Sequence, residues 1–182
     1  GAGPAGLAAA RAARSRGAQV TLVDAADAVG GQYWRHLPEA RAGAREDVLH
    51  HGWARFAAMR EQLSQDTDVR ILTSTQVWAI DRGAEGTLRV HAFEGPVDGP
   101  GRQPHTLTAE SIILATGAHD RSLPFPGWTL PGVVTAGAAQ ALAKSERVAI
   151  GRRVVVAGAG PFLLPVAASL SQVGAGVVGV FE

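Results

Sequence analysis

The stretch that decides the fold of this chain is its first six residues, Gly1-Ala2-Gly3-Pro4-Ala5-Gly6. Their glycine spacing is that of a dinucleotide-binding turn, in which a strand passes into a helix. Gly1 permits a tight turn, Gly3 lets the backbone approach a pyrophosphate, and Gly6 lets the helix pack closely. Pro4 suits the first helical turn, where no N–H donor is needed. We therefore predict a Rossmann-like α/β unit with a pyrophosphate at the helix N-terminus.

An acidic residue follows this turn at about the distance expected for a contact with ribose hydroxyl groups. Asp24 ends the apolar run Val20–Val23, which fits a short, buried parallel strand. The glycine pattern recurs late in the chain as Gly158-Ala159-Gly160, with Glu182 behind it. The sequence therefore predicts two such turns, which we call the first glycine turn (1–6) and the second glycine turn (158–163).

Composition places the chain among ordinary globular proteins. It has 182 residues, of which 46% are hydrophobic, and a formal net charge of +1. Because Lys and Arg are not concentrated in any run, nothing suggests nucleic acid or an anionic membrane as a partner. No apolar run is long enough to span a bilayer and no signal-like segment is visible, so we expect a cytoplasmic protein. Zero cysteines exclude disulfides and thiolate metal sites within the chain.

Hydrophobic periodicity predicts the helices between the two turns. We expect one helix over Pro4–Arg16, ended by Gly17, and a mostly helical segment over 44–65 with one buried face. His50 and His51 lie in this second segment. Since adjacent histidines on a helix point in different directions, we interpret both as surface residues and predict no metal site.

Strands are predicted in the middle of the chain. Val69–Ile80 and Thr87–Phe93 indicate an antiparallel meander, which Thr106–Glu110 extends. The apolar run Ser111–Ala115 then fits the centre of the parallel sheet. Because a dinucleotide-binding turn normally follows a strand and none precedes Gly1, we expect the first strand of this unit to be missing from a fragment.

Two further glycine-containing stretches fit a close approach to a cofactor. Gly30-Gly31-Gln32 follows the ribose-binding acid, so its paired glycines can bring backbone close to the ligand. The alternative is a plain turn with a partly buried aromatic cluster. Thr116-Gly117 ends the predicted central strand, beyond which ligands of open α/β sheets bind. All five residues are therefore candidates for cofactor binding.

Along the chain come the first glycine turn, Asp24, Gly30-Gly31, Ala115-Thr116-Gly117 and the second glycine turn. A chain with these features in this order resembles a flavoprotein of the two-dinucleotide-domain family. The run from Arg121 onward, with Pro124-Phe125-Pro126-Gly127-Trp128, is similar to the subgroup of opine oxidase, hydrogen cyanide synthase and sarcosine oxidase alpha-type subunits. We therefore identify the chain as resembling that subgroup.

The resemblance implies FAD on the first glycine turn. It implies an adenosine ribose on Asp24 and a Thr116-Gly117 turn that closes over the cofactor. It also implies contacts to the pyrophosphate from the first turn, at Gly1, Gly3, Pro4, Ala5 and Gly6.

The resemblance also implies a second dinucleotide site, or its remnant, at Gly158, Gly160 and Glu182. This turn departs from the pattern because Leu163 stands where Gly6 stands in the first. NAD is a candidate ligand here, and a structural remnant is the alternative that we favour. We expect an FAD-binding domain over 1–120, a crossover segment over 121–151 and the start of a second dinucleotide-binding domain over 152–182.

The crossover segment is expected to be irregular because it is rich in proline. Thr135 is a predicted N-cap for a helix that runs through Ala143. Around the start of the segment lie His119, Asp120 and Arg121, which could approach a ligand. We favour the alternative that they form a local ion pair that holds the crossover.

The implied function is FAD-dependent oxidation of a small-molecule amine, opine or amino-acid derivative by one subunit of a larger hetero-oligomer. Flavoprotein disulfide reductases commonly carry a pair of thiols at the place where this chain has Gln32-Tyr33-Trp34. The sequence therefore disfavours a reductase that works through a local disulfide. No pairing of nucleophile and base supports a catalytic assignment, so no catalytic residue is predicted. Two alternatives are an NADH-dependent flavoprotein reductase that serves a protein or quinone acceptor, and a non-catalytic dinucleotide-sensing module.

Overall fold

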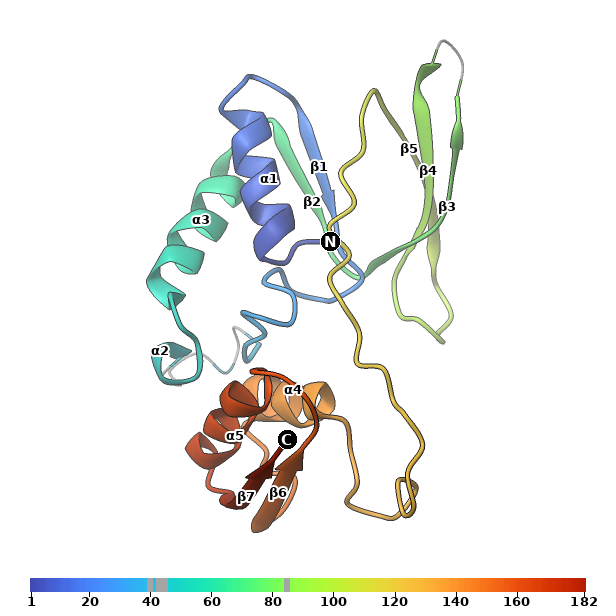
Figure 1. The fold of residues 1–182 in the computed structure, drawn as a ribbon. Coiled ribbons are helices and arrows are strands. Elements are labelled where there is room, and N and C mark those ends of the chain that lie inside the picture. The colour runs from blue at the N-terminus through green and yellow to red at the C-terminus, as the bar shows by residue number, and fades with distance from the viewer. Residues whose placement is uncertain (39–40, 42–45, 84–85) are drawn as a thin grey trace. The chain divides into compact units, whose positions relative to one another are not determined.

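The computed structural model describes residues 1–38, 41, 46–83 and 86–182. By their contacts these residues form two compact units, coloured along the chain in Figure 1. We call the first unit Gly1–Trp34 with Gly52–Gly117, and the second unit Arg35–His51 with Ala118–Glu182.

A parallel strand pair with two helices forms the body of the first unit. Strand β1 (Val20–Val23) pairs in parallel with β2 (Val69–Leu72), in the register Val20 to Val69 and Val23 to Leu72. Helix α1 (Pro4–Arg14) contacts β1, and α3 (Trp53–Gln65) contacts β2. The two helices also contact each other and lie side by side in Figure 1. This arrangement confirms the Rossmann-like α/β prediction.

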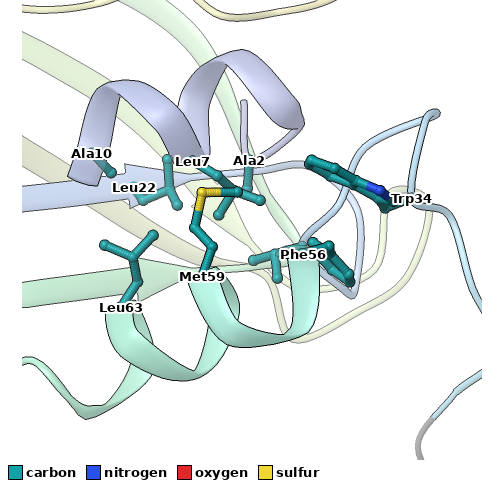
Figure 2. Packing of buried hydrophobic residues seen from close by; sticks show 9 residues of the cluster. Ala2, Leu7, Ala10, Leu22, Trp34, Phe56, Met59 and Leu63 are labelled. Atoms are coloured by element: carbon teal, nitrogen blue, oxygen red, sulfur yellow. The ribbon is translucent and has the colours of Figure 1, made fainter. Parts of the chain in front are cut away.

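The core of this unit lies between the helices and the strand pair. Figure 2 shows Leu7 and Ala10 of α1 facing Phe56, Met59 and Leu63 of α3, with Leu22 of β1 beside them. These positions recur every three or four residues along each helix, which is the spacing of one buried helical face. Ala2, inside the first glycine turn, is a fully buried member of the same cluster. The hydrophobic core therefore fixes the position of the turn itself.

The segment predicted as one strand over Val69–Ile80 is two strands with different partners. β2 belongs to the parallel pair, whereas β3 (Thr75–Arg82) runs antiparallel to β4 (Leu88–Glu94), which pairs with β5 (Gln103–Ala109). The break falls at Ser74, whose φ of +48° lies in the left-handed region, where the chain changes direction. The predicted meander is thus present, and it begins after β2.

The prediction of a central strand over Ser111–Ala115 is wrong. The structure has no strand there, and Ile113 and Leu114 are 67% and 73% exposed. A parallel strand needs a hydrogen-bonding neighbour. In the described part of the chain β1 pairs only with β2, so no strand stands beside this run.

The helix predicted over 44–65 is interrupted, and one of its histidines is buried. Residues 42–45 lie outside the described part; beyond them α2 (Glu46–Leu49) and α3 are separated by Gly52, whose φ is +70°. His50 is only 3% exposed, which corrects its surface assignment. Its ring nitrogens lie 2.8 Å from Glu46 O and 2.5 Å from Arg35 O, and burial lowers its pKa below the usual value. His51 is exposed, as expected.

The second unit also contains a parallel strand pair packed against helices. β6 (Arg153–Ala157) pairs in parallel with β7 (Gly176–Phe181), and α5 (Leu163–Gln172) contacts both strands. Helix α4 (Ala136–Glu146) packs against α5 and shares its apolar cluster. The predicted N-cap is confirmed, because the Thr135 hydroxyl accepts a hydrogen bond from the Ala138 N–H at 3.2 Å.

Asp120 was predicted to form an ion pair, but its carboxylate instead binds the N-terminus of α4. It accepts a hydrogen bond from the Gly137 N–H at 2.6 Å, at the start of α4. Among the described residues, it has no ion pair with Arg121 or His119. An acidic side chain stabilises the N-terminus of a helix because the N–H groups there lack partners, so Asp120 holds the crossover through α4.

Arg14 ties the end of α1 to the connection between α3 and β2. Its guanidinium donates to Asp66 at 2.9 Å, to Asp68 at 2.8 Å and to Ala18 O at 2.6 Å, and its side chain is 17% exposed. The hydrogen bond that Arg14 donates to Asp66 lowers the pKa of the Asp66 carboxyl group. The stabilisation is therefore complete above the unfolded-state pKa of about 3.9 and is lost as the pH falls through the lower folded-state pKa.

We predict that Arg14→Ala lowers the melting temperature at about pH 7, and that this difference is smaller at about pH 3, which lies below the unfolded-state pKa of an aspartate, about 3.9. Arg11→Ala is the matched control on the same helix, since Arg11 is exposed. Thermal unfolding of the three proteins at both pH values is the measurement. Equal melting temperatures for the two variants at neutral pH would contradict the role given to Arg14.

Candidate functional site

Two of the three glycines in the first turn are required by packing within the protein. A Cβ on Gly1 would lie 2.1 Å from Ala115 O, and a Cβ on Gly6 would lie 1.8 Å from Gly1 O. Both distances are impossible for a real side chain. Gly1 and Gly6 therefore allow α1, the chain that enters it and the end of the 111–115 run to approach one another closely.

Gly3 is not required by any such contact. The nearest protein atom to a Cβ at this position is Gly31 Cα at 3.7 Å, an ordinary van der Waals distance, and the φ of Gly3 is an unstrained −75°. Gly3 is also the N-cap of α1, without a side-chain hydrogen bond and with no acidic residue in the first helical turn. The first turn of α1 itself thus supplies neither a capping side chain nor an acidic residue beside the bare backbone of Gly3. This combination fits a pyrophosphate that approaches Gly3 directly.

The glycine pair at Gly30-Gly31 packs against the first turn. Gly30 N–H donates to Ala2 O at 2.8 Å, and a Cβ on Gly31 would lie 2.8 Å from Gly3 Cα. Both glycines have positive φ, +123° and +59°. The pair therefore brings its backbone close to Gly3 of the first turn, and Trp34, which follows it, is buried.

Asp24 reaches the same turn from the end of β1. Its carboxylate accepts a hydrogen bond from the Ala2 N–H with Oδ2 and another from the Ala26 N–H, at 2.8 Å, with Oδ1. The backbone of Asp24 is fixed as well, because its N–H donates to Leu72 O and its C=O accepts from Thr75 N–H, both at 2.8 Å. The predicted ribose-binding acid is thus rigidly placed beside the glycine turn.

The remaining predicted residues differ in how near they come to the turn. Thr116 is close, since its Cα lies 3.5 Å from the Cβ position of Gly1. Gly117 has a φ of +73°, which a larger residue rarely adopts, and nothing within 4 Å of its Cβ position. Gln32 is exposed, and its side chain makes no hydrogen bond within the described residues. The structure therefore brings together the first turn, Asp24, Gly30-Gly31 and Thr116, with Gln32 and Gly117 next to them in the chain.

Sequence reasoning missed the apolar residues that hold this site. Ala2 is 0% exposed, and Trp34 stacks on Phe56 with ring centroids 5.0 Å apart. The aromatic residues after the glycine pair were a signal for Trp34, whereas Ala2 is inconspicuous between two glycines. Ala2 connects the first glycine turn to the core, and Trp34 connects the glycine pair to it.

The second glycine turn is built differently from the first. Helix α5 begins only at Leu163, the sixth position of the pattern, whereas α1 begins at Pro4, the fourth. The Leu163 side chain lies 3.2 Å from the Cβ position of Gly158 and belongs to the apolar cluster of the second unit. The Gly160 N–H donates to Glu182 Oε1 at 3.0 Å. An open hollow of about 470 Å³ lies beside this turn, lined by Gly160, Pro161, Leu163, Leu164, Val180 and Glu182.

Comparison with known proteins decides the family. The chain matches the family described as pyridine nucleotide-disulphide oxidoreductase over residues 1–181. The chain belongs to this family. It therefore has the dinucleotide-binding, Rossmann-like fold of a flavin-dependent oxidoreductase, and the family implies FAD as its cofactor.

Individual relatives include named subunits of several enzymes. Over the whole chain it is 38% identical to the hydrogen cyanide synthase subunit HcnB of Pseudomonas protegens, covering 37% of that protein. Over 96% of the chain it is 34% identical to an opine oxidase subunit of Rhizobium meliloti, covering 32% of it. It is also 31% identical to the alpha subunit of a Corynebacterium sarcosine oxidase, covering 19% of it. The chain thus spans well under half the length of these relatives.

A solved structure has the same fold. A polycyclic ketone monooxygenase from the fungus Thermothelomyces thermophila superposes with a TM-score of 0.59 at 19% identity, covering 100% of this chain and 34% of the monooxygenase chain. At this identity the likeness concerns the fold alone.

The family's description mentions disulphides, but this chain has no cysteine, and Gln32-Tyr33-Trp34 follow the glycine pair. In the part of the chain that the structure covers, no three His, Asp or Glu side chains gather closely enough to hold a metal ion. The helices of that part are also too short or too polar to cross a bilayer.

We predict that Gly3→Ser separates flavin binding from folding. Serine is a good N-cap, so the flavin-free variant should melt no lower than wild type, while its side chain should weaken FAD binding at least about tenfold. Gly31→Ala should lose both stability and flavin, because its Cβ collides with Gly3.

Gly17→Ala is the control for backbone strain, since Gly17 also has a positive φ of +81° but no atom within 4 Å of its Cβ position. It should lose stability and keep flavin. Flavin content per protein and the melting temperature of flavin-free protein are the measurements. Full flavin content in pure Gly3→Ser would contradict the pyrophosphate assignment.

Proposed function

We propose that the protein containing this chain is an FAD-dependent oxidoreductase subunit that oxidises an amine, an opine or an amino-acid derivative. Support comes from relatives named for opine oxidation and sarcosine oxidation. FAD, when bound, supplies the acceptor for the electrons that leave the substrate. The residues of this chain bind and orient that cofactor.

The observation that carries the proposal is the bare backbone at Gly3. Packing accounts for the absence of a side chain at Gly1 and Gly6 but not at Gly3, so a ligand that must approach this backbone is the remaining reason. In the proposed site the first turn, with Pro4 and Ala5, holds the pyrophosphate, and Asp24 holds the adenosine ribose. Further contacts to the cofactor come from Gly30, Gly31, Gln32, Thr116 and Gly117.

The proposed organisation has three parts. Residues 1–120 form the FAD-binding domain, 121–151 the crossover and 152–182 the start of a second dinucleotide-binding domain. Because the relatives are named subunits, we propose a hetero-oligomer with another oxidase subunit. We expect the protein in the cytoplasm and a small molecule as its substrate.

At the second glycine turn we propose a structural remnant rather than a working NAD site. An N–H that would face a pyrophosphate is bound to the protein's own Glu182 carboxylate. In addition, the late start of α5 moves the helix N-terminus away from the turn, and Leu163 fills the place of the third glycine. On this proposal substrate, and not a nicotinamide, reduces the flavin.

A second candidate function is an NADH-dependent reductase that delivers electrons to a protein or quinone. It is favoured by the hollow beside Gly160 and by the acid at the end of β7, since Glu182 would bind ribose hydroxyls and repel the 2′-phosphate of NADP. The two candidates differ in what reduces the flavin.

We predict that the full-length protein, mixed anaerobically with NADH, bleaches its flavin no faster than free FAD mixed with NADH. An opine or a secondary amine such as sarcosine should bleach it within the enzyme's turnover time. Absorbance near the flavin maximum follows both reactions. Rapid bleaching by NADH would establish the reductase alternative, and a preference for NADPH would contradict the role given to Glu182.

A further inference from the structure

Asp24 has a second task in addition to the ribose contact that its position predicts. We propose that its carboxylate holds the first glycine turn in the shape that receives the pyrophosphate. The inference rests on the proposed FAD site and adds a positioning role for a residue so far assigned only to the ribose.

Ala2 is held at both of its backbone polar groups. This residue is fully buried, and both of its backbone groups are bound to the protein. Its N–H donates to the Asp24 carboxylate and its C=O accepts from Gly30 N–H at 2.8 Å. A buried N–H without an acceptor is strongly unfavourable, so the carboxylate is needed even when no ligand is present.

Asp24 is fixed through its backbone as well as its side chain. Its backbone is hydrogen-bonded to Leu72 on one side and Thr75 on the other, so the side chain projects from a rigid junction between β1, β2 and β3. Its two oxygens accept from two different N–H groups, those of Ala2 and Ala26. An asparagine offers only one oxygen and would turn an N–H₂ group toward one of these donors.

The hydrogen bonds to the turn leave acceptor sites on Asp24 for a ribose. Each carboxylate oxygen has two lone pairs and uses one on a backbone N–H, so hydroxyl groups of a ribose can still donate to it. Asp24 can therefore hold the turn and the ligand at once. It couples the pyrophosphate end of the site to the ribose end.

The second unit contains the same kind of connection. Glu182 follows β7 as Asp24 follows β1, and its carboxylate accepts from the Gly160 N–H at 3.0 Å. The longer side chain reaches the third residue of its turn, whereas Asp24 reaches the second. A link between the acid and the glycine turn thus occurs twice in this chain, although the acids differ.

The test separates a ribose contact from a hold on the turn by means of a ligand without ribose hydroxyls. ADP and 2′,3′-dideoxy-ADP are titrated into flavin-free full-length protein, as wild type and as Asp24→Asn. If Asp24 holds the turn, Asp24→Asn weakens both ligands, by about tenfold each. If it acts only on the ribose, the loss is seen for ADP and vanishes for the dideoxy ligand, and the proposal is overturned.

Amide hydrogen exchange in the same flavin-free proteins gives a readout that needs no ligand. Asp24→Asn should accelerate exchange at Ala2 and Gly30, while amides of β4 keep their wild-type rates. Asp27→Asn, which makes the same charge change at an exposed residue nearby, should alter neither exchange nor affinity. Unchanged exchange at Ala2 in Asp24→Asn would also overturn the proposal.

The two failures can be told apart. If wild type binds neither ADP nor FAD at this turn, the proposed cofactor site is wrong, and the exchange rates still decide whether Asp24 holds the turn. If wild type binds both and Asp24→Asn retains wild-type affinity for dideoxy-ADP, the cofactor site stands and the positioning role fails.

Discussion

The first unit depends on how the backbone of one buried residue, Ala2, is bound. Its N–H is held by Asp24 from the end of β1, and its C=O is held by the Gly30 turn. Its methyl group packs in the core that α1, α3 and β1 share (Figure 2). Polar and apolar contacts therefore fix the same point of the chain. Gly3 and the N-terminus of α1 come directly after Ala2 in the chain, so the contacts of Ala2 fix their positions.

The sequence predicted the parts of the site that depend on backbone geometry. Glycines at fixed spacing, an acid after a short apolar strand and a paired glycine turn are local patterns, and the structure brings them together. The pattern also predicted that Gly6 serves close packing, and the contact at its Cβ position agrees. Spacing alone does not reveal which atoms crowd these glycines, such as Ala115 O beside Gly1.

Errors arose where a segment's partner decides its structure. The run 111–115 has the composition of a central strand, but a strand needs neighbours, and composition does not supply them. Ser74 divides a continuous β-pattern because a single residue with positive φ redirects the chain. Helical position predicts an exposed His50, yet the carbonyl groups of Arg35 and Glu46 enclose it. Each of these outcomes depends on contacts distant in sequence or on one dihedral angle.

The two glycine turns show how one pattern can serve two purposes. In the first, the helix begins directly after Gly3 and its N-terminus has no capping side chain. In the second, Leu163 fills the space of the third glycine and the helix starts later, so the turn is closed by its own core and by Glu182. This difference underlies our proposal that FAD is bound at the first turn and that the second has mainly a packing role.

The central claim is that the first glycine turn, and not the second, receives the dinucleotide. Hydrogen exchange of the full-length protein with and without FAD tests it most directly, because a bound pyrophosphate accepts hydrogen bonds from the turn's N–H groups. The account predicts that FAD slows exchange over residues 1–7 and leaves residues 158–164 unchanged. Protection of the second turn, or none at the first, would contradict it.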